Sequence, residues 1–441
     1  MTKPNSSIRG VGAFLLVIAL WLMGGAPTHA QECDPNAVSL APLIDEAFTR
    51  PASFDWQGDW LQDDFVCFPS RQSGAELRSY LLAPADIATR TDRLPVVVIG
   101  PGSGSGQALY YLWSARELAG HGYLALVVDP QGVGRSEING DPEQCDTDGC
   151  PGVPFQQASN YVDAFLSSLD FVGRRGHPWL QKADLTSIGI AGHSLSARAA
   201  AFVQGEDFRV QAVVAWDNLS SDLNGDAGIS SGGGTCGSLI GGELPSEVPV
   251  TVRVPAMGQA SDRPPTCDVT GENNHPQVKK TAYEVWKQAG VPSMQLVFND
   301  AAHADWAQAR GSDPLQLQLF QYYTRAWFDL YLKGDESAAL ARLVDRNPLG
   351  QMPEEVFSTQ FESALFIPQR VTNCESLLND PCELRDIVDN PVPPLTPSSS
   401  GGSVSLPALF AMLLLTATRR SSWLTRLFRR LSSSPEAREV S

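Results

Sequence analysis

Residues 191–196 read A-G-H-S-L-S and place Ser194 two positions after Gly192, with His193 between them. The stretch before Ser194 is apolar and typical of a strand, and the alanine-rich stretch after it is typical of a helix. A serine at such a junction has two interpretations. It can cap the helix, or it can be the nucleophile of a strained strand-to-helix turn, which needs small neighbours such as Gly192. These six residues alone favour neither interpretation.

A nucleophilic serine needs a general base, and histidine is the most common one. His303, in N-D-A-A-H-A-D-W, follows the last predicted strand and comes after Ser194 in the chain. This matches the order Ser, then Asp or Glu, then His, that such turns require. His303 is therefore the predicted base. The other histidines lie in the leader, before strands or helices, or beside the serine: His29, His121, His177, His193 and His275.

A carboxylate must hold the imidazole in the correct tautomer. Asp262 follows a strand predicted over 254–258, Asp217 follows one predicted over 210–216, and Asp268 is a third candidate. Each aspartate could equally form a turn. We expect Asp262 to be the acid, because its strand directly precedes the one that leads to His303, and neighbouring strands would bring the two side chains together.

The glycine-rich sequence G-P-G-S-G-S-G (100–106) follows a predicted strand and can supply backbone N–H groups to a developing negative charge. The expected donors are the N–H groups of Ser103 and Leu195. A phosphate-binding loop is the alternative, but the sequence lacks the G-K-[ST] ending of that loop. A dinucleotide fingerprint is excluded because its third glycine would fall at Gln107.

Alternating strands and helices must position these residues. Strands buried on both faces are predicted from continuous apolar runs such as 94–100 and 123–129. The pattern predicts a mostly parallel sheet covered on both faces, with the site at the carboxyl ends of the strands. Further strands are expected at 186–191, 210–216, 254–258 and 293–298, and helices at 107–119, 155–172, 277–289 and 314–333.

Taken together, P-G-S-G-S-G, the segment 118–136, G-H-S-L-S and A-A-H-A-D-W resemble the α/β-hydrolase superfamily. The branch most similar is that of dienelactone hydrolases and cutinase-like polyester hydrolases, whose last core helix resembles 326–335. The resemblance spans about residues 60–340. It implies the α/β-hydrolase fold, a mostly parallel sheet with helices on both faces, and catalysis without a metal or an organic cofactor.

Residue by residue, the resemblance implies a nucleophile at Ser194, a base at His303, an acid at Asp262, and oxyanion donors at Ser103 and Leu195. Dienelactone hydrolases proper use a cysteine nucleophile, so their own activity is not implied here.

One further position and two departures bear on the substrate. Trp216 resembles an aromatic residue that lines the polyester-hydrolase cleft, and a core residue is the equal alternative. Ser196 stands where the motif has glycine, and Pro101 stands where histidine is common. These departures weaken the polyester interpretation more than the hydrolase interpretation.

The two ends of the chain are predicted to be targeting signals. Residues 1–30 have two basic residues, an apolar run and a small-residue exit at Ala30, which predict a cleaved secretory signal; an N-terminal anchor is the alternative. A Pro/Ser/Gly linker (389–402) precedes an apolar run of 15 residues and a cluster of arginines. The run is shorter than the ~20 residues of an ordinary spanning helix.

The segment 403–441 resembles the GlyGly-CTERM sorting signal of some Gram-negative bacteria. This resemblance implies transient membrane insertion, removal by a sorting protease, and delivery to the cell surface or beyond. A plain C-terminal anchor is the alternative. The catalytic domain would then be 31–388, with disulfide-bearing extensions at both ends.

Removing both ends makes the protein more acidic. The chain has 32 basic and 49 acidic residues, of which 24 and 47 remain in 31–402, a net charge of about −23. Such a surface repels nucleic acid and anionic lipid, so no nucleic-acid partner is expected.

All eight cysteines lie in the exported part, and their even number predicts disulfides. No C-x₂-C pair occurs, so a zinc site is not predicted. Nearness in sequence favours two pairs and leaves two more: Cys145–Cys150, Cys374–Cys382, Cys33–Cys67 and Cys236–Cys267.

The sequence as a whole predicts a secreted or surface serine esterase that cleaves carboxylic esters through a Ser-His-Asp triad and an acyl-enzyme. A peptidase or another acyl hydrolase is the alternative within enzymes. A surface binding protein that keeps this fold but has lost activity is the alternative outside them. The presence of all the required residues argues against that last class.

Overall fold

The computed structural model describes residues 59–103, 107–137, 158–217, 219–223, 248–263, 280–307, 313–372, 374–380 and 382–385. The chain divides into two units, 1–385 and 386–441, and all described residues belong to the first. The predicted signal peptide, the linker and the sorting tail lie outside the described residues. So do Asp268 and five of the cysteines: Cys33, Cys145, Cys150, Cys236 and Cys267.

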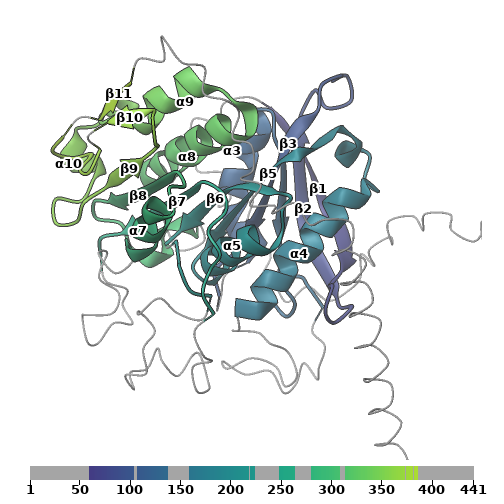
Figure 1. The fold of residues 1–441 in the computed structure, drawn as a ribbon. Coiled ribbons are helices and arrows are strands. Elements are labelled where there is room, and N and C mark those ends of the chain that lie inside the picture. Colours follow the sequence, from purple (N-terminus) through teal and green to yellow (C-terminus); the bar gives the residue numbers. More distant parts are fainter. Residues whose placement is uncertain are drawn as a thin grey trace, which may run out of the picture. The chain divides into compact units, whose positions relative to one another are not determined.

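A nine-stranded sheet forms the centre of the described part (Figure 1), with the order β1-β2-β4-β3-β5-β6-β7-β8-β9. The six strands from β4 to β8 in this order are parallel, whereas β1, β2 and β9 join antiparallel to their neighbours. The predicted mostly parallel sheet is therefore confirmed. The strands are β1 (Trp60–Pro69), β2 (Glu76–Pro84), β3 (Leu94–Gly100), β4 (Leu124–Val128), β5 (Ala183–His193), β6 (Val210–Trp216), β7 (Ala256–Ser261), β8 (Ser293–Phe298) and β9 (Ala364–Phe366).

Two hydrophobic cores cover the two faces of this sheet, because alternate residues of a strand point to opposite sides. In β3, Val97 and Ile99 belong to one core, and Val96 and Val98 belong to the other. Helices α3 (Leu112–Gly120), α8 (Pro314–Phe328) and α9 (Glu336–Leu343) contribute to the first core. Helices α4 (Ala158–Arg174), α5 (Leu195–Glu206) and α7 (Thr281–Gln288) contribute to the second. Figure 1 shows α4 and α5 in front of the strands.

The segment after α9 closes one edge of the sheet. It contains the short helix α10 (Pro353–Val356), strand β9, and a two-stranded sheet of β10 (Val371–Thr372) and β11 (Glu383–Leu384). A disulfide joins Cys374 to Cys382 in the segment that connects these two strands, which confirms that predicted pair. Cys67, on β1, is also disulfide-bonded.

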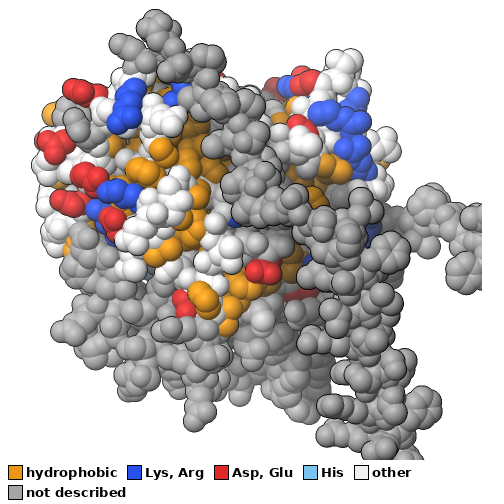
Figure 2. All heavy atoms as spheres, viewed as in Figure 1, with side chains coloured by type: hydrophobic (Ala, Val, Ile, Leu, Met, Phe, Trp, Pro, Cys, Tyr) orange, Lys and Arg blue, Asp and Glu red, His pale blue; other side chains and the backbone are white. Residues whose placement is uncertain are grey.

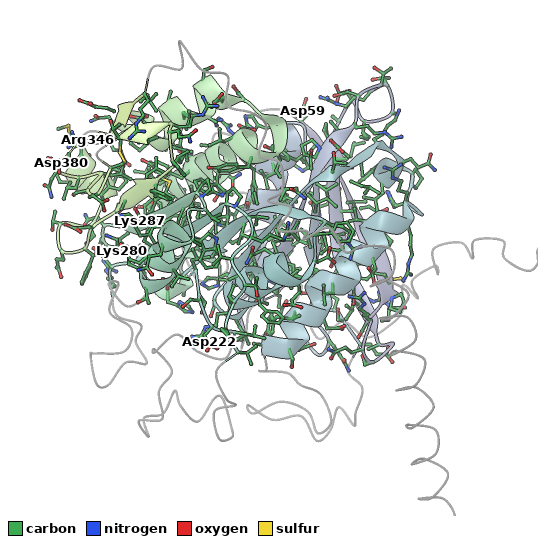
Figure 3. The ribbon with its side chains drawn as sticks, in the orientation of Figure 1. Asp59, Asp222, Lys280, Lys287, Arg346 and Asp380 are labelled. Carbon is green, nitrogen blue, oxygen red and sulfur yellow. A yellow bond between two sulfur atoms is a disulfide. The ribbon has the colours of Figure 1, made fainter. Side chains whose placement is uncertain are left out.

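Ion pairs tie α7 to this C-terminal segment. Lys287 lies on α7 and Lys280 is the residue directly before this helix (Figure 3); Lys287 pairs with Glu375 at 2.6 Å and Lys280 with Glu362 at 3.5 Å. On the face shown in Figure 2, acidic and basic side chains lie around an area of apolar ones. The described part of that face is therefore not uniformly acidic, although the sequence has a large acidic excess. No helix among the described residues is long and apolar enough to cross a membrane.

Candidate active site

Ser194 occupies the turn between β5 and α5, with backbone angles φ 55° and ψ −114°. Positive φ is rare outside glycine and indicates a strained turn. The Ser194 side chain makes no capping hydrogen bond to any described residue of α5. Its Oγ lies instead 3.0 Å from His303 Nε2. The turn therefore presents the hydroxyl to the histidine rather than to the helix.

Close packing explains the small residues around this turn. A Cβ atom on Gly192 would lie 2.5 Å from the backbone oxygen of Ser196, so only glycine fits there. Ser196 takes the place of the second glycine of the motif, and its hydroxyl donates to the carbonyl of Pro101 at 2.6 Å. The departure from the motif thus fits the turn and adds a hydrogen bond that glycine could not make.

His303 follows β8 and begins a short 3₁₀ turn that ends at Trp306. Its Nδ1 lies 2.6 Å from Asp217 Oδ2, and its Nε2 faces Ser194. Because a carboxylate only accepts hydrogen bonds, Nδ1 carries the proton in the neutral imidazole. Nε2 is then free to accept the proton of the Ser194 hydroxyl.

Asp217 directly follows β6, has φ 41°, and is only 2% exposed. Besides His303, the Ser261 backbone N–H and hydroxyl both donate to its carboxylate, each at 3.0 Å. Its own N–H donates to the carbonyl of Gln259 at 2.7 Å. The carboxylate is thus fixed by donors from β7 and from the turn after β8.

The expectation that the Asp262 carboxylate lies beside the His303 imidazole is wrong, because Asp217 is the aspartate hydrogen-bonded to His303. The Asp262 carboxylate accepts instead from the Asp300 backbone N–H and the Ser358 hydroxyl, and burial raises its pKa. Side chains alternate along an extended chain, so Ser261 points towards Asp217 and Asp262 does not. Ser261 is small, and this lets Asp217 reach past the end of β7 to the histidine.

Ser103 and Leu195 lie where β3 and β5 end. These strands pair in parallel with Gly100 opposite Gly192. Ser103 and Leu195 each follow their member of this pair by three residues. Leu195 is the first residue of α5, and its N–H has no acceptor within its own helix. Residues 104–106, the rest of the glycine-rich loop, lie outside the described residues.

Trp216 is a core residue, which corrects the cleft-lining interpretation. Its side chain is 0% exposed, and its indole N–H donates to Thr324 Oγ1 at 3.1 Å. It also packs against Trp113 and stacks on Tyr111. As the last residue of β6, it points into the core beneath α8, whereas the next residue turns into the site.

His193 takes part in the site in a way that the sequence did not predict. Its Nδ1 lies 2.7 Å from the hydroxyl of Tyr111, and its Nε2 lies 2.8 Å from the carbonyl of His303. Its position beside Ser194 was the only signal in the sequence, since Tyr111 is 82 residues away.

The described residues contain no group of three His, Cys, Asp or Glu side chains that could hold a metal ion.

Comparison with known proteins adds no relative: no family model matches the chain, and no curated protein is similar to it.

Proposed function

We propose that this protein is a serine esterase with the α/β-hydrolase fold, which hydrolyses carboxylic esters through an acyl-enzyme. The observation that carries the proposal is the hydrogen-bond chain from Ser194 Oγ through His303 to Asp217, with distances of 3.0 and 2.6 Å. A nucleophile, a base and an orienting acid in this order are the parts of a serine-hydrolase triad. The strained turn at Ser194 and the helices on both faces of a mostly parallel sheet support the proposal of an α/β-hydrolase fold.

In the first half of the reaction, Ser194 Oγ attacks the ester carbonyl carbon while His303 Nε2 takes the hydroxyl proton. The buried Asp217 carboxylate stabilises the imidazolium that forms. Negative charge develops on the carbonyl oxygen, and the N–H groups of Ser103 and Leu195 are the proposed donors to it. The C–O bond then breaks, and His303 gives its proton to the leaving alcohol.

In the second half, a water molecule attacks the acyl-enzyme and His303 takes one of its protons. The tetrahedral intermediate collapses, the bond to Ser194 Oγ breaks, and the serine regains its proton from His303. The products are a carboxylic acid and an alcohol. In this scheme His303 carries out every proton transfer.

The purified full-length chain should hydrolyse p-nitrophenyl esters, and Ser194→Ala should abolish this hydrolysis and the labelling by a fluorophosphonate probe. Ser168→Ala is the matched control, because Ser168 is a buried serine of α4 whose hydroxyl donates to the Ala164 carbonyl. If Ser194→Ala hydrolysed esters as the unchanged protein does, the proposal would be wrong. Preferential cleavage of p-nitroanilides over the matching esters would instead favour a peptidase.

We also propose that the protein acts at the surface of, or outside, a Gram-negative cell, with its C-terminal tail removed. The Cys374–Cys382 disulfide is consistent with an oxidising compartment. The remaining support comes from the sequence of the two ends.

A further inference from the structure

The peptide unit between Pro101 and Gly102 is hydrogen-bonded at both of its polar atoms. Its carbonyl oxygen accepts from Ser196 Oγ at 2.6 Å, and its N–H donates to Tyr111 Oη at 3.0 Å. Ser196 is 1% exposed and Tyr111 is 0% exposed, so neither bond competes with bulk water. The two hydroxyls come from α5 and from the turn before α3, and together they hold this peptide from both sides.

The Tyr111 hydroxyl is itself oriented by the residue beside the nucleophile. His193 Nε2 faces the carbonyl of His303, which can only accept, so Nε2 carries the proton. In the neutral ring Nδ1 is then an acceptor, and the Tyr111 hydroxyl donates to it at 2.7 Å. The phenolic oxygen can therefore accept from the Gly102 N–H.

Packing around this peptide leaves little room for it to move. A Cβ atom on Gly102 would lie 2.7 Å from His193 Nδ1, and one on Gly100 would lie 2.5 Å from Ser196 Oγ. Both glycines are therefore in close contact with side chains that belong to the hydrogen-bond chain.

We propose that Ser196, Tyr111 and His193 are positioning residues that hold the Pro101–Gly102 peptide in place and thereby aim the Ser103 N–H at the oxyanion. A peptide unit is planar, so fixing its C=O and its N–H fixes the whole unit. The Ser103 N–H belongs to the next peptide unit, which is joined to the fixed one only through the φ and ψ angles of Gly102. Because glycine has many allowed angles, the direction of the Ser103 N–H would be poorly defined if the first peptide were not held. This inference rests on the proposed function.

The same arrangement gives His193 a second contact with the machinery, because its Nε2 bonds to the backbone of the base. The oxyanion turn after β3 and the histidine turn after β8 are thus joined through one imidazole. It also gives Ser196 a role that glycine could not have.

The test measures Tyr111→Phe and Ser196→Ala in the full-length chain, each of which deletes one bond to the held peptide and little volume. With p-nitrophenyl butyrate as substrate, each should lower kcat about tenfold and change KM less than about twofold. A propyl trifluoromethyl ketone forms a tetrahedral oxyanion on Ser194. Its affinity should fall by the same factor as kcat/KM, because both depend on the oxyanion donors.

The matched controls are Tyr161→Phe and Ser168→Ala. Tyr161 is fully buried, and its hydroxyl has no hydrogen-bond partner among the described residues. Both controls should keep kcat and the affinity for the ketone within about twofold. Each rate is divided by the concentration of active sites titrated with a fluorophosphonate, so that a loss of folded protein is not mistaken for a loss of catalysis.

The inference is overturned if both test variants keep kcat and the affinity for the ketone within about twofold, or if the lost rate is not matched by lost affinity. Should one variant fail to fold, the other decides, since each removes a bond to a different atom of the same peptide. Full activity in Ser194→Ala would defeat the proposed function itself. Inactive Ser194→Ala beside normal Tyr111→Phe and Ser196→Ala would defeat only the positioning role.

Discussion

Replacing Asp217 by asparagine should abolish the proposed esterase activity through the tautomer of His303. The Ser261 N–H donates to Asp217 Oδ1, so an asparagine will keep its carbonyl oxygen at that position. Its NH₂ group then takes the place of Oδ2, which faces His303 Nδ1 and the Ser261 hydroxyl. An N–H donor facing Nδ1 makes Nδ1 the acceptor, and the ring proton moves to Nε2. A protonated Nε2 cannot accept the proton of Ser194.

The expected loss in kcat is about 10⁴-fold, which corresponds to about 5.5 kcal/mol of transition-state stabilisation. Asp262→Asn is the matched control, because an amide oxygen can still accept from Asp300 and Ser358, and it should keep kcat within about threefold. Stopped-flow or steady-state hydrolysis of p-nitrophenyl butyrate gives kcat, and circular dichroism checks the fold of both variants. If Asp262→Asn were the inactive variant, or if Asp217→Asn kept a tenth of the activity, the assignment of the acid to Asp217 would be wrong.

Four further outcomes are expected. Ester hydrolysis should decline on acidification, because only a neutral imidazole can accept the proton of Ser194; a flat kcat/KM profile between pH 5 and 9 would contradict this. Burial and the neighbouring Arg325 lower the pKa of His121, so the folded protein favours its neutral form. Stability from this group is present above about pH 6.5, the pKa of an unperturbed histidine, and is lost on acidification; urea unfolding at pH 7.5 and 5.5 should show a smaller decrease in His121→Gln than in the unchanged protein. Alkylation and mass spectrometry of the secreted protein, with and without reduction, should find no free thiol. Peptides from 420–430 should be absent from the surface or secreted fraction, and their recovery there would show that the tail is an anchor.

The sequence predicted those parts of the site that depend on where strands end. Ser194 follows β5 and His303 follows β8, and apolar runs bounded by glycine and aspartate locate both ends well. Proximity in sequence also predicted the Cys374–Cys382 disulfide, because a loop of this length closes easily. Such features are local, so short segments contain the information.

The aspartate that contacts His303 could not be predicted in this way. Asp217 follows β6 and His303 follows β8, so the Asp217 carboxylate has to extend past the end of β7, which lies between them. Strand order favoured the residue after β7, but the positive φ of Asp217 and the small Ser261 let the carboxylate extend from β6. The predicted strand 254–258 also ends three residues early, since β7 continues to Ser261. The face to which Trp216 points, and the contact between Tyr111 and His193, likewise depend on register and packing between distant segments.

The parallel strands that position Ser194, Asp217 and His303 also determine when these residues can come together. Ser194 and His303 are 109 residues apart, and parallel strands can pair only after the chain between them has been formed. Contacts of such long sequence separation form slowly during folding. In the proposed esterase, a growing chain in which β8 has not yet formed therefore lacks His303 beside Ser194, and its serine is not activated. If the proposed function and export hold, the protein would not hydrolyse esters of the cell that makes it until nearly the whole sheet has been assembled.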